Sequence, residues 1–279
     1  MSKKLFKEPR WSYQSMRKEL IRFDKLYKLR PIYNNKGGML YSHMFALYYI
    51  LRKIKPKFVV ESGIYRGQST WLIEKTLPKS KILSLDLYLN KRTYISKSKN
   101  VTYSDKDFKF QNFKSIPKNS LVFFDDHQNS IERIMQSNFF GIEHLVFEDN
   151  YSVNDSTEDM YSLKSIFSNS GFVYKFNWRS NLRLLLRFIP YILKKNIFKK
   201  YYAYIDSFGW SLRDVPPNKS DSKNLEKKLE YYYEFPPTFK PEFSTVNRPI
   251  LNSKYKTVFP QAYSEAHSFN NITYLKLKN

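Results

Sequence analysis

One stretch, residues 57–90, constrains the fold of this chain more than any other part of it. It opens with an apolar run at 58–60 that ends in an acid and a glycine. A pattern of apolar residues at helical spacing follows, and a second apolar run at 82–85 ends in another acid. The pattern predicts a strand, a glycine turn, a helix and a second strand. This is a βαβ unit with an acid at the end of each strand.

The predicted turn contains two of the 7 glycines of the chain, Gly63 and Gly67. Gly63 can take backbone angles that are closed to other residues, and Gly67 lets the start of the helix lie close to a ligand. Asp86 ends the second strand, roughly twenty residues after the turn, where a carboxylate can bind the ribose hydroxyls of a nucleotide-like cofactor. The unit therefore predicts a nucleoside-binding site.

The same alternation continues along the chain. Apolar runs at 101–103, 121–124 and 145–147 are separated by helical patterns or loops, and most of them end in acids. An alternating run at 272–277 indicates a late edge strand. We therefore predict a doubly wound α/β fold, with a mostly parallel sheet covered by helices on both faces. The acids gather at the carboxyl edge, where such sheets bind ligands.

The chain divides into four predicted parts. They are N-terminal helices packing on the core (1–56), a cofactor-binding α/β core (57–178), an insertion or cap (179–270) and a final edge strand of the core (271–279). Strand residues are also expected at 172–174 and a short charged helix at 224–233. Residues 181–201 are apolar and basic together, so they form either a cap over the site or a helix on a membrane surface. Pro190 interrupts a single helix there and favours the cap.

Composition limits the classes of function. The formal charge of +23 indicates an anionic partner, such as nucleic acid, a phospholipid surface or a phosphorylated substrate, or else lysines spread over solvated faces. The chain has no cysteine, which excludes disulfides, a thiolate nucleophile and cysteine-bound metals. We find neither the apolar region of a signal peptide nor a membrane span, and we expect a cytoplasmic protein, with peripheral membrane contact through 181–201 as the alternative.

The order of motifs resembles a known family. Glu61-x-Gly63-x-x-x-Gly67-x-Ser69 is followed by Asp86, then by an Asp-Asp-His and an Asp-Asn at two later strand ends. This order resembles the class I S-adenosylmethionine-dependent methyltransferases, and among them the group related to macrocin O-methyltransferase and the cephalosporin hydroxylase-like proteins. The resemblance covers about residues 40–175 and implies a seven-stranded sheet of the Rossmann-like type.

The resemblance also implies a set of cofactor contacts. Glu61, Gly63, Gly67 and Ser69 would line the methionine end of S-adenosylmethionine, and Asp86 would hold its ribose. Asp105 would approach the adenine, and Asp125 would face the cofactor. The simpler interpretation is that Glu61 and Asp86 are ordinary acids at strand ends.

A metal site is implied by the same comparison. Asp126 with Asp149 and Asn150 resembles the ligand set of metal-dependent O-methyltransferases, and Asp125 is a second candidate for the first ligand. Carboxylate and amide oxygens suit Mg²⁺, which would lower the pKa of a substrate hydroxyl. Alternatively, Asp125 and Asp126 only close a strand and accept hydrogen bonds from helix-start amides.

His127 is the candidate catalytic base. The lysine of catechol-type enzymes is replaced by Asn129 in this chain, which leaves His127 as the nearest group able to take a proton at neutral pH. The other histidines have no expected role in catalysis: His43 lies in a helix that packs on the sheet, His144 starts its strand at the opposite edge, and His267 lies in the insertion.

These observations predict an enzyme that transfers a methyl group from S-adenosylmethionine to an oxygen of a sugar or a similar polyhydroxylated small molecule or glycan. Two alternatives stay open. One is a nucleic-acid methyltransferase that uses the basic surface. The other is a catalytically inactive relative that acts as a membrane-surface or assembly protein.

Overall fold

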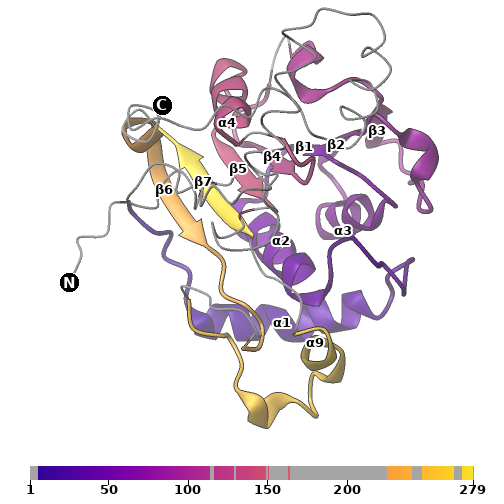
Figure 1. Ribbon diagram of the computed structural model, residues 1–279, viewed down its shortest axis with the longest axis vertical. Coiled ribbons are helices and arrows are strands. Elements are labelled where there is room, and N and C mark those ends of the chain that lie inside the picture. Colours follow the sequence, from indigo (N-terminus) through magenta and orange to yellow (C-terminus); the bar gives the residue numbers. More distant parts are fainter. Residues whose placement is uncertain are drawn as a thin grey trace, which may run out of the picture. The chain divides into compact units, whose positions relative to one another are not determined.

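A computed structural model gives the structure of the chain. It describes residues 6–113, 116–128, 130–148, 150, 163, 225–240, 247–266 and 272–278. The chain forms two compact units, of which the first comprises residues 1–126, 134–150 and 228–279 and the second 127–133 and 151–227. The first unit contains the whole of the described sheet (Figure 1).

The described strands form one sheet in the order β3-β2-β1-β4-β5-β7-β6. Their bounds are β1 Phe58–Ser62, β2 Lys81–Leu85, β3 Val101–Ser104, β4 Ser120–Phe124, β5 His144–Phe147, β6 Leu229–Glu234 and β7 Thr273–Leu277. Strands β1 to β5 pair in parallel, and β7 runs antiparallel to both β5 and β6. The predicted doubly wound, mostly parallel seven-stranded sheet is confirmed.

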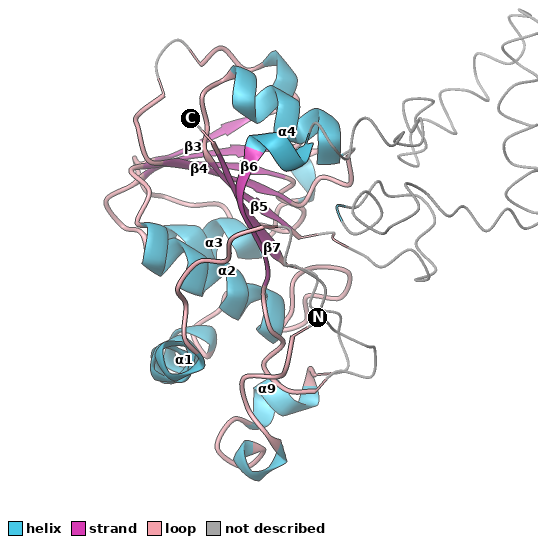
Figure 2. Ribbon diagram, turned by 90° about the vertical axis from the view of Figure 1, so that its left-hand side faces the viewer, coloured by secondary structure: helices cyan, strands magenta, loops and turns pink. Residues whose placement is uncertain are grey.

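Helices cover both faces of the sheet (Figure 2). Helices α1 (Tyr13–Tyr27), α2 (Tyr41–Ile54) and α3 (Gln68–Thr76) lie on one face, and the second half of α4 (Ser130–Phe139) lies on the other. The short elements are η1 Leu89–Lys91, η2 Phe108–Phe110, η3 Ser253–Tyr255 and α9 Pro260–Ser264.

The core lies between the sheet and α2. Every residue from Tyr41 to Leu51 is buried, because α1 covers one side of α2 and the sheet covers the other. Helix α1 contributes residues at helical spacing to this core: Met16, Leu20 and Phe23 are fully buried and Tyr27 is nearly so. Since α2 runs back to the start of β1, its first turn lies at the carboxyl edge of the sheet.

The C-terminal strands correct two expectations. The segment expected to be a short helix at 224–233 forms strand β6 from Leu229 onward, where pairing with β7 overrides the helical pattern. The run predicted as an edge strand forms β7, which lies between β5 and β6, so β6 is the edge. The strand predicted at 172–174 and the segment 181–201 lie outside the described residues.

Candidate functional site

The registers of the parallel strands bring the predicted site residues to one edge. Ser62 pairs with Leu85 of β2 and with Phe124 of β4. The residues that follow these three are Gly63, Asp86 and Asp125, so they lie side by side where the strands end. Leu85 in turn pairs with Ser104 of β3, which places Asp105 next to Asp86. The sequence alone predicted this grouping.

Gly63 is required by the close approach of two backbones. Its φ is +95°, in the region that favours glycine, and a Cβ added there would lie 2.0 Å from the carbonyl oxygen of Asp125. Asp125 donates its amide to the carbonyl oxygen of Ser62 at 2.8 Å. The turn after β1 is therefore packed directly against the end of β4.

Gly67 lies against the loop that follows β2. A Cβ at Gly67, whose φ is +94°, would lie 2.5 Å from the carbonyl oxygen of Tyr94. The carbonyl oxygen of Arg66 accepts hydrogen bonds from the amides of Thr93 and Tyr94, both at 2.9 Å. The loop after β2 thus folds back over the turn. Gly67 is thus required by the close approach of this loop. Its expected approach to a ligand stays a prediction.

Glu61 is fully buried below the turn. Its Oε2 accepts hydrogen bonds from the hydroxyls of Thr70 and Ser84, both at 2.6 Å. Burial raises the pKa of this carboxyl, and hydrogen bonds from Ser69, Ser84 and Thr70 oppose the rise. Within the described chain, Oε1 receives no hydrogen bond of ordinary geometry. Glu61 therefore ties the start of α3 to β1 and β2, and only Oε1 is left for another donor.

Asp86 holds the glycine turn in place. Its Oδ2 accepts hydrogen bonds from the amides of Ile64 and Tyr65 at 2.9 and 3.0 Å, and its Oδ1 accepts one from the amide of Tyr88 at 2.8 Å. A carboxylate can accept about four hydrogen bonds, so capacity remains for a ligand hydroxyl. Asp86 is half-buried and Asp105 is exposed. Their roles toward ribose and adenine stay predictions.

Two residues near Asp86 were missed by sequence reasoning. Leu87 directly follows Asp86 and is 62% exposed, so it presents an apolar side chain at the carboxyl edge. Gln68 begins α3 and is buried, and its Oε1 has no hydrogen-bond partner among the described residues. An apolar residue directly after a strand-end acid was the available signal for Leu87, whereas no local pattern marks Gln68.

The acidic residues after β4 and β5 are only partly placed. Asp126 Oδ2 accepts a hydrogen bond from the Ser62 hydroxyl at 2.5 Å. Asn150 is buried, and its Nδ2 donates to Thr273 Oγ1 at 2.6 Å and to the Tyr232 hydroxyl at 3.1 Å. Those bonds use the amide nitrogen, whereas a metal would bind the amide oxygen. Asp149 lies outside the described residues, which contain no cluster of three metal-ligating side chains.

The histidines occupy different surroundings. His127 is exposed, has a φ of +53° and belongs to the second unit. His144 begins β5 at the amino edge as predicted; its Nδ1 lies 2.8 Å from the Tyr274 hydroxyl, and burial lowers its pKa. His43, in the first turn of α2, is buried in contact with Glu148 at the end of β5. His267 lies outside the described residues.

The chain matches no protein-family model and no curated protein. It is similar to solved structures of methyltransferases. One of these structures is CmcI in its form with S-adenosylhomocysteine, which is 16% identical to this chain with a TM-score of 0.35. The match covers 53% of this chain and 82% of CmcI. In the ligand-free form of CmcI the matched part is 51% of that chain, about half its length.

Two further structures extend the comparison. The S-adenosylhomocysteine-bound methyltransferase PaMTH1 of Podospora anserina is 11% identical over 93% of this chain and 88% of its own, with a TM-score of 0.38. An O-methyltransferase from Bacillus cereus in complex with S-adenosylhomocysteine is 13% identical over 65% and 80%, with a TM-score of 0.32. These neighbours are methyltransferases, as the resemblance predicted. Identities and TM-scores this low transfer no residue role to this chain.

The part of the chain that the structure describes has no helix long and apolar enough to cross a membrane.

Proposed function

We propose that this protein is an S-adenosylmethionine-dependent O-methyltransferase that acts on a sugar or another polyhydroxylated small molecule. The observation that carries the proposal is the glycine turn after β1. Its backbone is packed against the end of β4 through Gly63 and is bound by the carboxylate of Asp86. In doubly wound sheets this is the place where a nucleoside ligand binds. The bound molecule would supply the methyl group.

The residues at this edge fit such a cofactor. Leu87 offers an exposed apolar surface beside Asp86, which suits a flat base next to a ribose. Gln68 Oε1 is a buried acceptor with no hydrogen-bond partner among the described residues, and an amino group is a donor that would satisfy it. The edge therefore combines hydrogen-bond acceptors with an apolar surface, and a nucleoside that carries an amino acid requires both.

Metal assistance is part of the proposal. Asp126 and Asn150 follow the paired strands β4 and β5, and Asp149 is adjacent to Asn150 in the sequence. These oxygens would hold Mg²⁺, whose charge would lower the pKa of the acceptor hydroxyl. The part of this chain is then to align the hydroxyl with the methyl group and to accept its proton, and His127 is the proposed base.

A first experiment tests the activity itself. Incubation with labelled S-adenosylmethionine and a panel of sugars and polyhydroxylated small molecules should give a product heavier by one methyl group, detected by mass spectrometry. Calorimetry should show binding of S-adenosylhomocysteine. Tight binding of NAD without any binding of S-adenosylhomocysteine would refute the methyltransferase function, and cofactor binding without transfer to any acceptor would indicate the inactive alternative.

The segment 181–201 offers a second test of the proposal. If it caps the site, its deletion should raise the apparent KM or abolish turnover and leave cofactor binding nearly intact, because a cap excludes water and completes the acceptor site. Unchanged kinetics combined with weaker binding to lipid vesicles would instead assign this segment to a membrane surface.

A further inference from the structure

The amino edge of the sheet, where strands β1 to β4 begin, carries a group of exposed lysines. They lie before β1, before and at the first residue of β2, in the loop that leads to β3, and before β4. We call them the basic edge: Lys55, Lys57, Lys79, Lys81, Lys97, Lys99 and Lys118. None of them belongs to the candidate site at the carboxyl edge.

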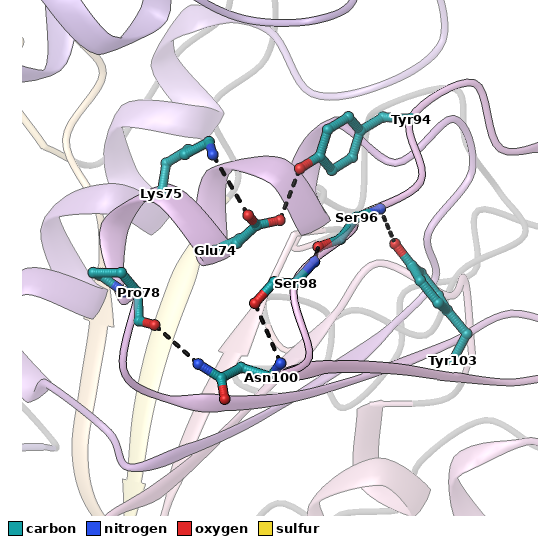
Figure 3. Close-up of polar contacts among 8 residues, drawn as sticks. All are labelled: Glu74, Lys75, Pro78, Tyr94, Ser96, Ser98, Asn100 and Tyr103. Atoms are coloured by element: carbon teal, nitrogen blue, oxygen red, sulfur yellow. Dashed lines mark hydrogen bonds and ion pairs between the residues drawn. The ribbon is translucent and has the colours of Figure 1, made fainter.

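Hydrogen bonds between the loops show that the basic edge is continuous. The amide of Lys57 donates to the carbonyl oxygen of Asn119 at 3.1 Å, and the amide of Lys81 donates to that of Lys57 at 3.0 Å. Asn100 Nδ2 donates to the carbonyl oxygen of Pro78 at 3.1 Å (Figure 3). The backbones that carry these lysines are therefore adjacent, although the lysines come from four separate loops.

The loops that carry the basic edge contain few acidic residues, although Glu143 lies at the same edge of the sheet, directly before β5. Of the acids between Lys55 and Lys118, only Glu74 is not at the carboxyl ends of the strands. Figure 3 shows its carboxylate engaged by the Tyr94 hydroxyl at 2.7 Å and by Lys75 at 3.5 Å. Within the described chain, no lysine of the basic edge lies within ion-pair distance of a carboxylate. Their charge is thus available to a partner.

An exposed apolar stripe borders the basic edge. Met135 and Phe139 of α4 are spaced by one helical turn, and they are 47% and 84% exposed. Phe139 contacts the ring of Phe140, which contacts Phe113, and Phe113 contacts Phe58, with centroid distances of 5.4, 4.9 and 6.4 Å. Phe58 is the first residue of β1 and directly follows Lys57.

We propose that the basic edge, together with Met135 and Phe139, binds the surface of an anionic lipid membrane. Lysines near such a surface each strengthen binding about fivefold, without any need for fixed geometry. An apolar stripe beside them is what enters the boundary between head groups and acyl chains. A nucleic acid would not need the exposed Met135 and Phe139, whereas a membrane surface would take up their apolar side chains. This proposal does not depend on the proposed function.

The test is co-sedimentation of the full chain with vesicles of phosphatidylcholine, alone or mixed with phosphatidylglycerol. We expect binding to the mixed vesicles only, and it should weaken as salt is added. Lys57→Glu, Lys81→Glu and Lys118→Glu combined should weaken binding at least about a hundredfold, the product of three fivefold effects. Phe139→Ser should weaken it several-fold even at high salt, because its contribution is apolar.

A matched control carries the same change of charge elsewhere: Lys18→Glu, Lys25→Glu and Lys254→Glu, at exposed positions of α1 and η3. This control should keep most of the vesicle binding, and thermal unfolding should confirm that both triple variants are folded. Equal losses in the two triple variants would show that net charge alone drives binding and would overturn the proposal. Unchanged vesicle binding in the Lys57, Lys81 and Lys118 variant would also overturn it. The same holds if this variant loses binding to RNA or DNA and keeps binding to vesicles.

Discussion

Replacing Gly63 by alanine gives the sharpest test of how the site is built. A Cβ at this position would lie 2.0 Å from the carbonyl oxygen of Asp125, 2.4 Å from the carbonyl carbon and 3.0 Å from the amide nitrogen of Asp126. All three atoms belong to the backbone, so no side-chain rotation can relieve the contact. The ends of β1 and β4 must separate.

The structure allows an estimate of the cost. The shortest contact has to lengthen by about 1 Å to become tolerable, and this breaks the hydrogen bond from the Asp125 amide to the Ser62 carbonyl oxygen. A buried amide left unpaired costs about 1–3 kcal/mol. The left-handed backbone of Gly63 adds about 1–2 kcal/mol once a Cβ is present. We expect a loss of roughly 2–5 kcal/mol in the free energy of unfolding, a large part of the stability of a typical domain.

The assay is urea unfolding of the variant and of a matched control, Gly141→Ala. Gly141 also has a positive φ, of +73°, but a Cβ there meets nothing within 4 Å. The Gly141→Ala variant should therefore lose only the cost of a left-handed backbone with a Cβ, about 1–2 kcal/mol of unfolding free energy. Affinity for S-adenosylhomocysteine, measured by calorimetry, should fall for Gly63→Ala and stay unchanged for Gly141→Ala. Equal losses of stability would show that the backbone contact costs nothing and would refute the reasoning.

Three other predictions follow from the same edge. Asp86→Ala should weaken binding of S-adenosylhomocysteine by about tenfold or more in calorimetry, because it frees the turn and leaves the ligand hydroxyls unpaired. Asp107→Ala, which removes a carboxylate that caps η2, should not weaken it. Burial raises the pKa of Glu61 in the folded state above its ordinary value of 4.5. The protonated Glu61 side chain therefore contributes fully to stability below pH 4.5, and this contribution is lost as the pH rises through the folded-state pKa. Urea unfolding of Glu61→Gln should therefore show stability that improves relative to the parent as the pH rises; a constant difference would contradict this. EDTA should abolish turnover, and added Mg²⁺ should restore it. Asp126→Asn should lose turnover and keep cofactor binding. His127→Ala should lower kcat more than it raises KM. Full activity in EDTA would exclude the metal.

The sheet and the grouping of acids were predictable because they depend on local patterns. A buried parallel strand has to be a short apolar run, and the runs at 58–60, 82–85 and 121–124 are of this kind. Once such strands pair in register, the residues after them share an edge. Gly63, Asp86 and Asp125 were therefore placed together from the sequence alone.

The parts that were not predictable depend on contacts between distant residues. Strand β6 has a mixed polar sequence, LEYYYE, and becomes a strand through its pairing with β7 about forty residues later. The folding of Thr93 and Tyr94 over Arg66 is likewise non-local, and it gives Gly67 a partner that no turn pattern could indicate. The burial of Gln68 Oε1 also depends on segments that are distant in the sequence, so no local pattern could predict it.

The separation of charge between the two edges resolves a difficulty in the composition. A net charge of +23 is unfavourable for the proposed binding of a cationic methyl donor and a metal ion. The carboxyl edge, however, carries acids such as Asp86 and Asp105, and the basic edge lies at the opposite end of the strands. A strand of five residues spans about 17 Å, roughly twice the distance over which physiological salt screens exposed charges. The lysines are therefore largely screened from the site. The overall charge is consequently compatible with the proposed cofactor and metal site, because most of the effect of the basic edge does not reach the carboxyl edge.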